Sequence, residues 1–284
     1  MFLLSLLPVA SAGLLEDVTG RVSPMWRLIA AASSGILFVA IFDQWINRFG
    51  IPSVDVFLDA WPWIAIGFTI FACAGATHAV NLIDGVNGLS GMWAVSAALS
   101  LALIAHTVDL DSHASALLLF ASAVAGFLLV NYPWGKIFLG DAGAYVIGHV
   151  LSWVAVSILW NASEVAPTAV LLIFLWPVAD TIYAIVRRLV KGTPLSKADS
   201  AHFHHLAFNI LVTRAGLSKR AANPASSLVI APLYLLPMAC GIVFWDNTAA
   251  SLALLCIFSV AFAVASQLAA RAARAPENAA VVVG

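Results

Sequence analysis

The chain has 284 residues; 62% are hydrophobic, only 10% are charged, and 13 lysines and arginines nearly balance 14 aspartates and glutamates, giving a net charge of -1. Water-soluble domains carry about a quarter charged residues, so this composition excludes a soluble globular enzyme. It also excludes a disordered chain and a basic nucleic-acid-binding protein. It predicts an all-α, polytopic membrane helical bundle that forms a single domain over residues 1–284.

Eight stretches are apolar over about the 20 residues that a helix needs to cross the hydrocarbon core. Backbone polar groups must be satisfied inside lipid, so these stretches are predicted to be helices. Their length excludes the roughly ten-residue alternating strands of a membrane β-barrel. They cover roughly residues 26–46, 60–80, 89–108, 114–131, 143–160, 167–187, 226–245 and 249–270.

A ninth apolar stretch, residues 1–15, is short, and two interpretations are open for it. Ala10-Ser11-Ala12 resembles the cleavage site of a signal peptide, but the positively charged segment that begins a signal peptide is missing. We therefore expect a partial span, the end of a helix whose beginning is missing. Further along the chain, Ser23-Pro24 and Pro167 predict helix starts, and Pro133 predicts a helix end.

The positions of lysine and arginine predict the orientation of the bundle. If residues 16–25 are cytoplasmic and the helices alternate, twelve of the thirteen basic residues lie inside and only Arg48 lies outside. Cytoplasmic loops are enriched in basic residues, so this topology is favoured over its inverse. It gives an outside N-terminus, an inside C-terminus and a cytoplasmic basic, His-rich loop at residues 188–225.

The same alternation brings the unusual polar residues to the cytoplasmic face. Carboxylates near membrane depth are costly and usually functional, so their convergence predicts a metal or phosphate site there. The residues concerned are Glu16, Asp17, Asp84, Asn87, Asp141, Asp180, Asp199, His202, His204 and His205.

The first polar segment, Asn81-Leu82-Ile83-Asp84-Gly85-Val86-Asn87-Gly88-Leu89, joins two predicted helices. If it is helical, Asp84 and Asn87 share a face, and the glycines let backbone or a ligand come close. Asp-Gly and Asn-Gly are also ordinary turn signals. A functional loop and a plain polar turn are both open from composition alone.

The second segment, Phe138-Leu139-Gly140-Asp141-Ala142-Gly143-Ala144, places Asp141 between glycines just before a predicted helix. A carboxylate there suits Mg²⁺, which prefers hard oxygen ligands. Aspartate is also a favoured N-cap, because it complements the helix dipole. A metal ligand and a helix cap are therefore equally open.

The third segment, residues 199–205, contains a His-x-His-His run. Zinc prefers a cleaner tetrahedral set of ligands, so we favour phosphate binding by imidazoles beside basic residues. A solvated, positively charged loop is the alternative. Asp180 shares a helix face with Arg187, and we interpret the two as a snorkelling pair near the interface.

Taken in order, these motifs resemble the polyprenyl-phosphate N-acetylhexosamine-1-phosphate transferases. That family includes the UDP-GlcNAc:undecaprenyl-phosphate GlcNAc-1-phosphate transferases and the phospho-N-acetylmuramoyl-pentapeptide transferases. Five motifs in the same order on one membrane face make the resemblance specific. The residues that carry it are 13–17 followed by 23–24 and 27–28 as the first motif, then 81–89, 138–143, 177–181 with 187–188, and 202–205.

The resemblance implies a reaction. The phosphate of a polyprenyl-phosphate lipid attacks the β-phosphorus of a UDP-sugar, the sugar 1-phosphate moves to the lipid, UMP leaves, and Mg²⁺ or Mn²⁺ is required. Phosphoryl transfer depends on positioning and charge neutralisation more than on covalent help. The resemblance also places the protein in the bacterial plasma (inner) membrane, as a multi-pass protein with its active site on the cytoplasmic face. A homodimer is one assembly that it allows.

The resemblance also assigns roles to residues. Asp17, Asp84 and Asp141 are the expected catalytic residues. Asp141 is the leading metal ligand, and Asp17 and Glu16 are further candidates. The expected substrate-binding residues are Asn81, Asn87, His202, His204 and His205.

Some features depart from the family. Glu16 replaces the first aspartate of the usual pair, Asn87 stands where many relatives have aspartate, and Ser200 stands where sugar-transferring relatives often have arginine. Relatives also carry two or more helices before the Glu16-Asp17 motif. We therefore expect either a start codon assigned too late or a truncated remnant.

Three alternatives follow. An inactive truncated member would be a non-catalytic membrane protein. Muramoyl-pentapeptide-phosphate transfer is another activity, although the His-x-His-His run looks more like the sugar-transferring branch. A transporter with an ion site at the membrane midplane is disfavoured, because the carboxylates gather at one face.

Overall fold

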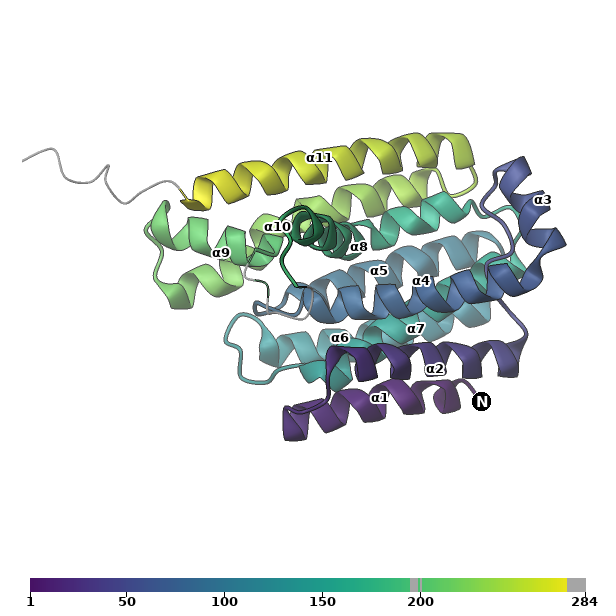
Figure 1. Ribbon diagram of the computed structural model, residues 1–284, viewed down its shortest axis with the longest axis horizontal. Coiled ribbons are helices and arrows are strands. Elements are labelled where there is room, and N and C mark those ends of the chain that lie inside the picture. The colour runs from purple at the N-terminus through teal and green to yellow at the C-terminus, as the bar shows by residue number, and fades with distance from the viewer. Residues whose placement is uncertain (195–198, 200, 275–284) are drawn as a thin grey trace, which may run out of the picture.

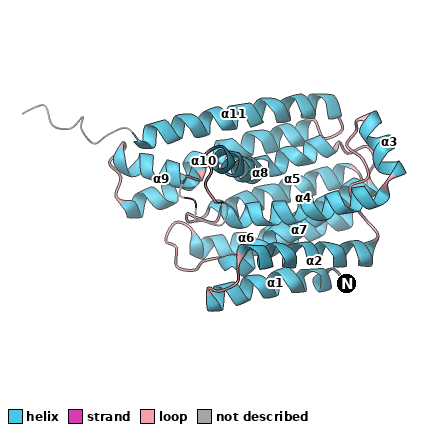
Figure 2. Cartoon of the chain, viewed as in Figure 1, coloured by secondary structure: helices cyan, strands magenta, loops and turns pink. Residues whose placement is uncertain are grey.

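The computed structural model describes residues 1–194, 199 and 201–274; Ser200 lies outside the described residues. In the described part, every regular element is a helix, and Figure 2 accordingly shows cyan helices joined by pink loops. The all-α prediction is therefore confirmed. The helices are α1 (Phe2–Thr19), α2 (Pro24–Phe42), α3 (Pro52–Ala60), α4 (Pro62–Leu82), α5 (Leu89–Thr107), α6 (Asp111–Asn131), α7 (Gly140–Asn161), α8 (Pro167–Val190), α9 (Phe203–Thr213), α10 (Lys219–Val243) and α11 (Thr248–Arg274).

Nine helices of the described residues are long and apolar enough to span a membrane; α3 and α9 are too short. The chain is thus a multi-pass membrane protein, and each of the eight predicted spans corresponds to one of these helices. The ninth stretch extends further than the partial span that we expected. It forms the 18-residue helix α1, which continues through Glu16 and Asp17 and ends where Gly20 adopts a left-handed conformation.

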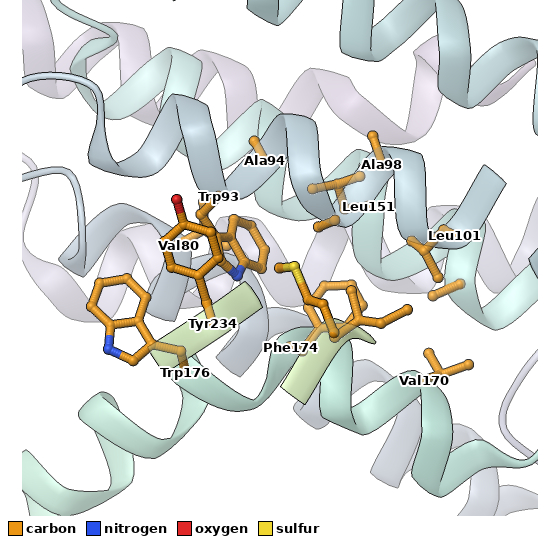
Figure 3. Close-up of a cluster of buried hydrophobic side chains, with 14 of the residues drawn as sticks. Val80, Trp93, Ala94, Ala98, Leu101, Leu151, Val170, Phe174, Trp176 and Tyr234 are labelled. Atoms are coloured by element: carbon orange, nitrogen blue, oxygen red, sulfur yellow. The ribbon is translucent and has the colours of Figure 1, made fainter. Parts of the chain in front are cut away.

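The helices lie side by side, with α1 and α11 at opposite edges of the bundle (Figure 1). Helices α5 and α7 form its centre, because 67% of each apolar span is buried against 11% for α11. Aromatic side chains fill the core between α5, α8 and α10 (Figure 3). The rings of Trp93 and Phe174 lie 5.8 Å apart, and those of Trp176 and Tyr234 lie 6.1 Å apart.

Predicted helix boundaries are confirmed at three places. The Ser23 side chain caps α2 by accepting a hydrogen bond from Trp26 N, and Pro24 is the first helical residue. Pro167 begins α8, and α6 ends at Asn131, before Tyr132-Pro133. The predicted cytoplasmic loop 188–225 is shorter than expected, because it contains α9 and because α10 already begins at Lys219.

Arg48, the one basic residue predicted outside, has a structural role at the end of α7. Its guanidinium donates hydrogen bonds to the carbonyl oxygens of Leu159 (3.1 Å), Ala162 (2.7 Å) and Val165 (2.8 Å). The last carbonyls of a helix lack partners within the helix. Arg48 therefore stabilises the far end of the same helix whose first turn contains Asp141.

Candidate active site

The polar segments singled out in the sequence meet at one end of the bundle. The end of α1, the turn between α4 and α5, the loop before α7 and the short helix α9 all lie at this end, on the left of Figure 1. The opposite end contains α3. The predicted convergence of these segments is therefore observed among the described residues.

Asp17 holds the first turn of α7. Its carboxylate accepts hydrogen bonds from Asp141 N (2.7 Å) and Ala142 N (3.0 Å), two of the helix N–H groups that lack a partner within the helix. Two glycines permit this approach. A Cβ on Gly140 would lie 2.6 Å from Asp17 Oδ2, and one on Gly13 would lie 2.6 Å from Ala142 Cα.

Asp141 lies inside the first turn of α7, and no side-chain cap is formed by the residue before that helix. Its carboxylate points elsewhere: Oδ1 accepts from Asn81 Nδ2 at 3.0 Å, and Oδ2 accepts from Arg27 Nη1. The alternative in which Asp141 caps its own helix is therefore wrong. Asp17 supplies that cap from another helix, and the Asp141 side chain remains in the site.

Arg27 joins two of the predicted metal candidates and was not among the predicted site residues. Its Nη1 also lies 3.9 Å from Glu16 Oε1, while Glu16 Oε2 accepts a hydrogen bond from Val22 N at 2.7 Å. The available signal was its place after Ser23-Pro24, which puts it one turn into α2. Glu16 and Asp141 thus converge on a guanidinium.

Asp84 lies in a turn, so the turn alternative describes the conformation of this segment, and Asp84 and Asn87 do not share a helix face. The Asp84 carboxylate accepts a hydrogen bond from the Ser90 hydroxyl. Burial raises the pKa of Asp84; the Ser90 hydrogen bond opposes this shift, and the negative charge of Asp141 adds to it. The two carboxylates are therefore close enough to repel each other.

Asn87 fixes this turn to the rest of the site. Its N–H donates to Asn223 Oδ1 (2.9 Å), its carbonyl accepts from Ser227 Oγ (2.6 Å), and its Nδ2 donates to Pro133 O (3.0 Å). Asn131 makes a similar bridge, because its Oδ1 accepts from Gly88 N and its Nδ2 donates to Ile137 O, both at 2.7 Å. Sequence reasoning missed Asn131, Asn223 and Ser227, which have no charge to mark them.

The His-x-His-His run is largely buried, so the alternative of a solvated loop is wrong for His202 and His204. His202 is 6% exposed and His204 is 2% exposed. The His204 ring covers Gly85, since a Cβ there would lie 2.1 Å from Nε2. Burial lowers the pKa of His204 to about 3, and the charge of His205 adds to the shift. Burial also lowers the pKa of His205.

Asp180 corrects a prediction. It is 3% exposed, and its carboxylate accepts hydrogen bonds from His202 Nδ1 (2.7 Å) and Phe203 N (3.0 Å). Arg187, its predicted partner, pairs instead with Asp199. The snorkelling pair is therefore wrong, because a carboxylate this deeply buried needs partners that are buried with it.

A pocket of about 630 Å³ opens beside the turn that contains Asn87. Its wall includes two aromatic side chains, Trp134 and Phe138, which are 64% and 75% exposed. Two basic side chains, Lys219 and Arg220 at the start of α10, also line it. Flat aromatic faces beside cations suit a ligand that has both a ring and phosphates.

The described residues contain no group of three His, Cys, Asp or Glu side chains arranged to hold a metal ion. Glu16, Asp17 and Asp141, the predicted metal set, instead have protein partners. The donor chemistry nevertheless suits Mg²⁺ at one place. Asp84 and Asp141 offer hard oxygen ligands, and their mutual repulsion would be relieved by a dication.

Residues 1–159, which contain Glu16, Asp17, Asp84 and Asp141, match the family model described as glycosyl transferase family 4. The chain is 32% identical over 151 residues to the probable undecaprenyl-phosphate N-acetylglucosaminyl 1-phosphate transferase of Bacillus subtilis (strain 168), covering 52% of this chain and 42% of that protein.

Two further relatives are more distant. The undecaprenyl-phosphate alpha-N-acetylglucosaminyl 1-phosphate transferase of Yersinia pestis is 26% identical over 249 residues, covering 76% of this chain and 66% of that protein. The phospho-N-acetylmuramoyl-pentapeptide-transferase of Bacillus pumilus (strain SAFR-032) is 28% identical over 181 residues, covering 63% and 55%. The chain thus matches between 42% and 66% of the length of these three relatives.

Proposed function

The chain belongs to glycosyl transferase family 4, and from that premise we propose that it transfers a sugar 1-phosphate from a UDP-sugar to a polyprenyl phosphate. In this reaction a phosphate oxygen of the lipid forms a bond to the β-phosphorus of the UDP-sugar. The bond from that phosphorus to the bridging oxygen breaks, and UMP leaves. The names of two relatives favour N-acetylglucosamine 1-phosphate as the transferred group.

One observation carries the proposal: separate segments of the chain organise a single carboxylate. Asp17 holds the backbone of Asp141, Arg27 and Asn81 bind its side chain, and Asp84 lies close enough to feel its charge. Such an arrangement fixes the position of negative charge at the end of the bundle opposite α3. Phosphoryl transfer depends mainly on positioned charge.

Mg²⁺, with Mn²⁺ as an alternative, is the cofactor that we propose, and Asp141 and Asp84 are the residues that would hold it. When bound, such an ion would neutralise the diphosphate and polarise its phosphoryl oxygens. Arg27 contributes a positive charge beside Asp141. The attacking phosphate needs little help from a base, since the second pKa of a phosphate monoester is about 6.

The pocket beside Asn87 is the proposed place of the nucleotide. Trp134 and Phe138 offer faces on which a base can stack, and Lys219 and Arg220 offer charge for phosphates. Outside this pocket wall, His204 has a buried Nδ1 with no hydrogen-bond partner among the described residues. This atom supports the predicted role of the His-rich segment in substrate binding.

We place the site at the cytoplasmic face of the bacterial inner membrane. The positive-inside pattern supports this orientation, and a soluble nucleotide sugar can meet a lipid head group there. The lipid substrate and the UDP-sugar are then the partners of the protein, and a homodimer is compatible with the proposal.

The test is a transfer assay with the full chain in membranes. Radiolabelled UDP-GlcNAc, undecaprenyl phosphate and Mg²⁺ should yield labelled lipid and UMP, and EDTA or Asp141→Asn should abolish the product. Asp111→Asn is a matched control, because Asp111 lies in the first turn of α6 with its side chain 74% exposed at the other end of the bundle. It should leave turnover unchanged.

Two outcomes would redirect the proposal. Product from UDP-MurNAc-pentapeptide but not from UDP-GlcNAc would favour the second candidate activity, to which the Bacillus pumilus relative points. A chain that is folded in membranes and gives no product from either donor would favour the non-catalytic alternative.

A further inference from the structure

A buried carboxylate in the apolar α8 has no catalytic, metal-binding or substrate-binding role in the prediction or in the proposed transfer chemistry. Asp180 is 3% exposed and lies one turn beyond Trp176 and Pro177, which are also buried. Burying a charge is expensive unless it is hydrogen-bonded. Its two oxygens are both used: Oδ2 accepts from His202 Nδ1 and Oδ1 accepts from Phe203 N.

These two contacts determine which edge of the His202 ring is available. With Nδ1–H donating to the carboxylate, the proton of the neutral ring is on Nδ1, and Nε2 is the bare acceptor. The bond to Phe203 N adds a second constraint, since this N–H belongs to the first turn of α9 and lacks a partner within that helix. Asp180 therefore fixes a ring and the helix start that carries it.

The fixed ring is part of a row that reaches the turn containing Asp84. The rings of His202 and His204 are stacked, with centroids 6.0 Å apart and planes 8° apart. The His204 ring in turn covers Gly85, the residue after Asp84. A change in the orientation of His202 would therefore be passed through one stacked ring to the turn at the site.

We propose that Asp180 is a positioning residue of the transferase site, which sets the tautomer and orientation of His202 and thereby aligns the His202–His204 row against the turn at Gly85. This inference rests on the proposed function. Asp180 does not itself contact the substrates; it acts through the Nε2 edge of His202, which the carboxylate leaves as an acceptor.

Asp180→Asn is the sharpest variant. Asparagine has one side-chain oxygen, and Phe203 N requires it, so the amide NH₂ faces His202 Nδ1 and favours the tautomer with the proton on Nε2. Thr168→Val is the matched control. Thr168 lies on the same helix, is also 3% exposed, and ties α8 to α11 through a 2.5 Å hydrogen bond to Ser251.

The first readout is independent of turnover. In the full chain labelled with ¹⁵N-histidine and held in lipid nanodiscs, the His202 ring nitrogens are assigned by their loss in His202→Asn. We expect the protonated nitrogen to be Nδ1 in the wild type and Nε2 in Asp180→Asn, with no change in Thr168→Val. Identical His202 spectra in the wild type and Asp180→Asn would overturn the inference.

The second readout is turnover. Asp180→Asn should lower kcat about 100-fold, the size of effect that misplacing a group by about 1 Å can have, while KM changes less. His202→Asn keeps a donor for Asp180 but lacks Nε2, so it should fold normally and lose as much activity. The double variant should be no worse than His202→Asn alone, because both changes act through the same edge.

The outcomes separate this inference from the function on which it rests. Full activity in Asp180→Asn or in His202→Asn refutes the positioning role while leaving the transferase intact. Asp180→Glu should recover part of the lost activity. If the activities of the variants instead follow their thermal stabilities, with Thr168→Val as inactive as Asp180→Asn, the positioning role is also refuted. A wild-type chain without turnover refutes the proposed function, whatever the His202 spectra show.

Discussion

Replacing Asp17 by alanine should loosen the first turn of α7 and misplace Asp141. The Asp17 carboxylate is the partner of two backbone N–H groups, those of Asp141 (2.7 Å) and Ala142 (3.0 Å). Alanine leaves both to water. Asparagine keeps one acceptor oxygen and removes the charge that favours a helix N-terminus. The two variants therefore form a graded series at one position.

The size of the effect follows from the two hydrogen bonds. A typical hydrogen bond contributes about 1 kcal/mol net, and loss of a helix cap costs about 0.5–2 kcal/mol. Both contacts are exposed to solvent, so water replaces part of each. We expect about 1 kcal/mol for Asp17→Ala and about half of that for Asp17→Asn. Amide exchange in the first turn should rise about fivefold and about twofold, respectively.

Hydrogen–deuterium exchange of the full chain in nanodiscs measures this directly, on a peptide covering residues 138–146. The centre of α5 serves as an internal reference, because it is buried and distant in sequence. Unchanged exchange of residues 138–146 in Asp17→Ala would refute the assigned role of the carboxylate. The prediction concerns local opening and does not depend on turnover.

The same variants separate positioning from metal binding. If Asp17 only holds α7, Asp17→Asn should have an activity between those of the wild type and Asp17→Ala, with an unchanged Mg²⁺ requirement. If Asp17 is a metal ligand, as the resemblance implies, both variants should be equally impaired and should need more Mg²⁺. We expect the first result, because both oxygens of Asp17 already accept backbone hydrogen bonds.

Three further predictions concern single residues. Gly85→Ala should displace His204, whose Nε2 would lie 2.1 Å from the new Cβ, and should lower turnover at least tenfold, whereas Gly75→Ala, with nothing within 4 Å, should not. The folded state holds His204 neutral down to about pH 3, while the same histidine takes up a proton near pH 6.5 in the unfolded chain. The free energy of unfolding should therefore fall as the pH drops through this range. Thermal unfolding at about pH 7.5 and about pH 5 should show a smaller difference in Tm for His204→Phe than for the wild type. Arg48→Gln should remove charged donors from three carbonyls and destabilise the protein by about 2–3 kcal/mol, seen as a lower Tm, without changing kcat; a loss of kcat at full stability would contradict the structural role of Arg48.

Long apolar runs and the prolines and caps between them predicted the bundle. Each span must present apolar side chains to lipid or to neighbouring helices along its whole length, and its ends are marked by proline or a capping residue. Ser23, Pro24 and Pro167 therefore lie where the sequence placed them. The length of α1 was harder to predict. Its polar end, Glu16-Asp17, is still helical, because acidic residues do not break a helix. The helix ends only at Gly20.

The site residues were predictable as a set but not in their contacts. Charge and position relative to the membrane grouped Asp17, Asp84 and Asp141 correctly on one side. Which oxygen meets which donor depends on helix packing, for instance on the close approach that Gly13 permits between α1 and α7. Hydrogen-bond bridges made by neutral residues, such as Asn131, leave no such mark in a sequence.

Charge balance at the site links the contacts to the proposed chemistry. Glu16 and Asp141 both pair with the guanidinium of Arg27, and the Asp84 carboxylate lies close enough to Asp141 to feel its charge, so three carboxylates share one positive group. When all are ionised, two negative charges remain uncompensated in the space where two anionic substrates would meet. A dication balances this excess, while a further lysine or arginine would balance only half of it. The arrangement is therefore incomplete as a structural ion-pair cluster and suited to a site that takes up a divalent cation together with phosphate.

Arg27→Gln increases the excess negative charge to three, so it should impair activity more at low Mg²⁺ than at high Mg²⁺. Equal impairment at every Mg²⁺ concentration would mean that Arg27 acts on the substrate alone.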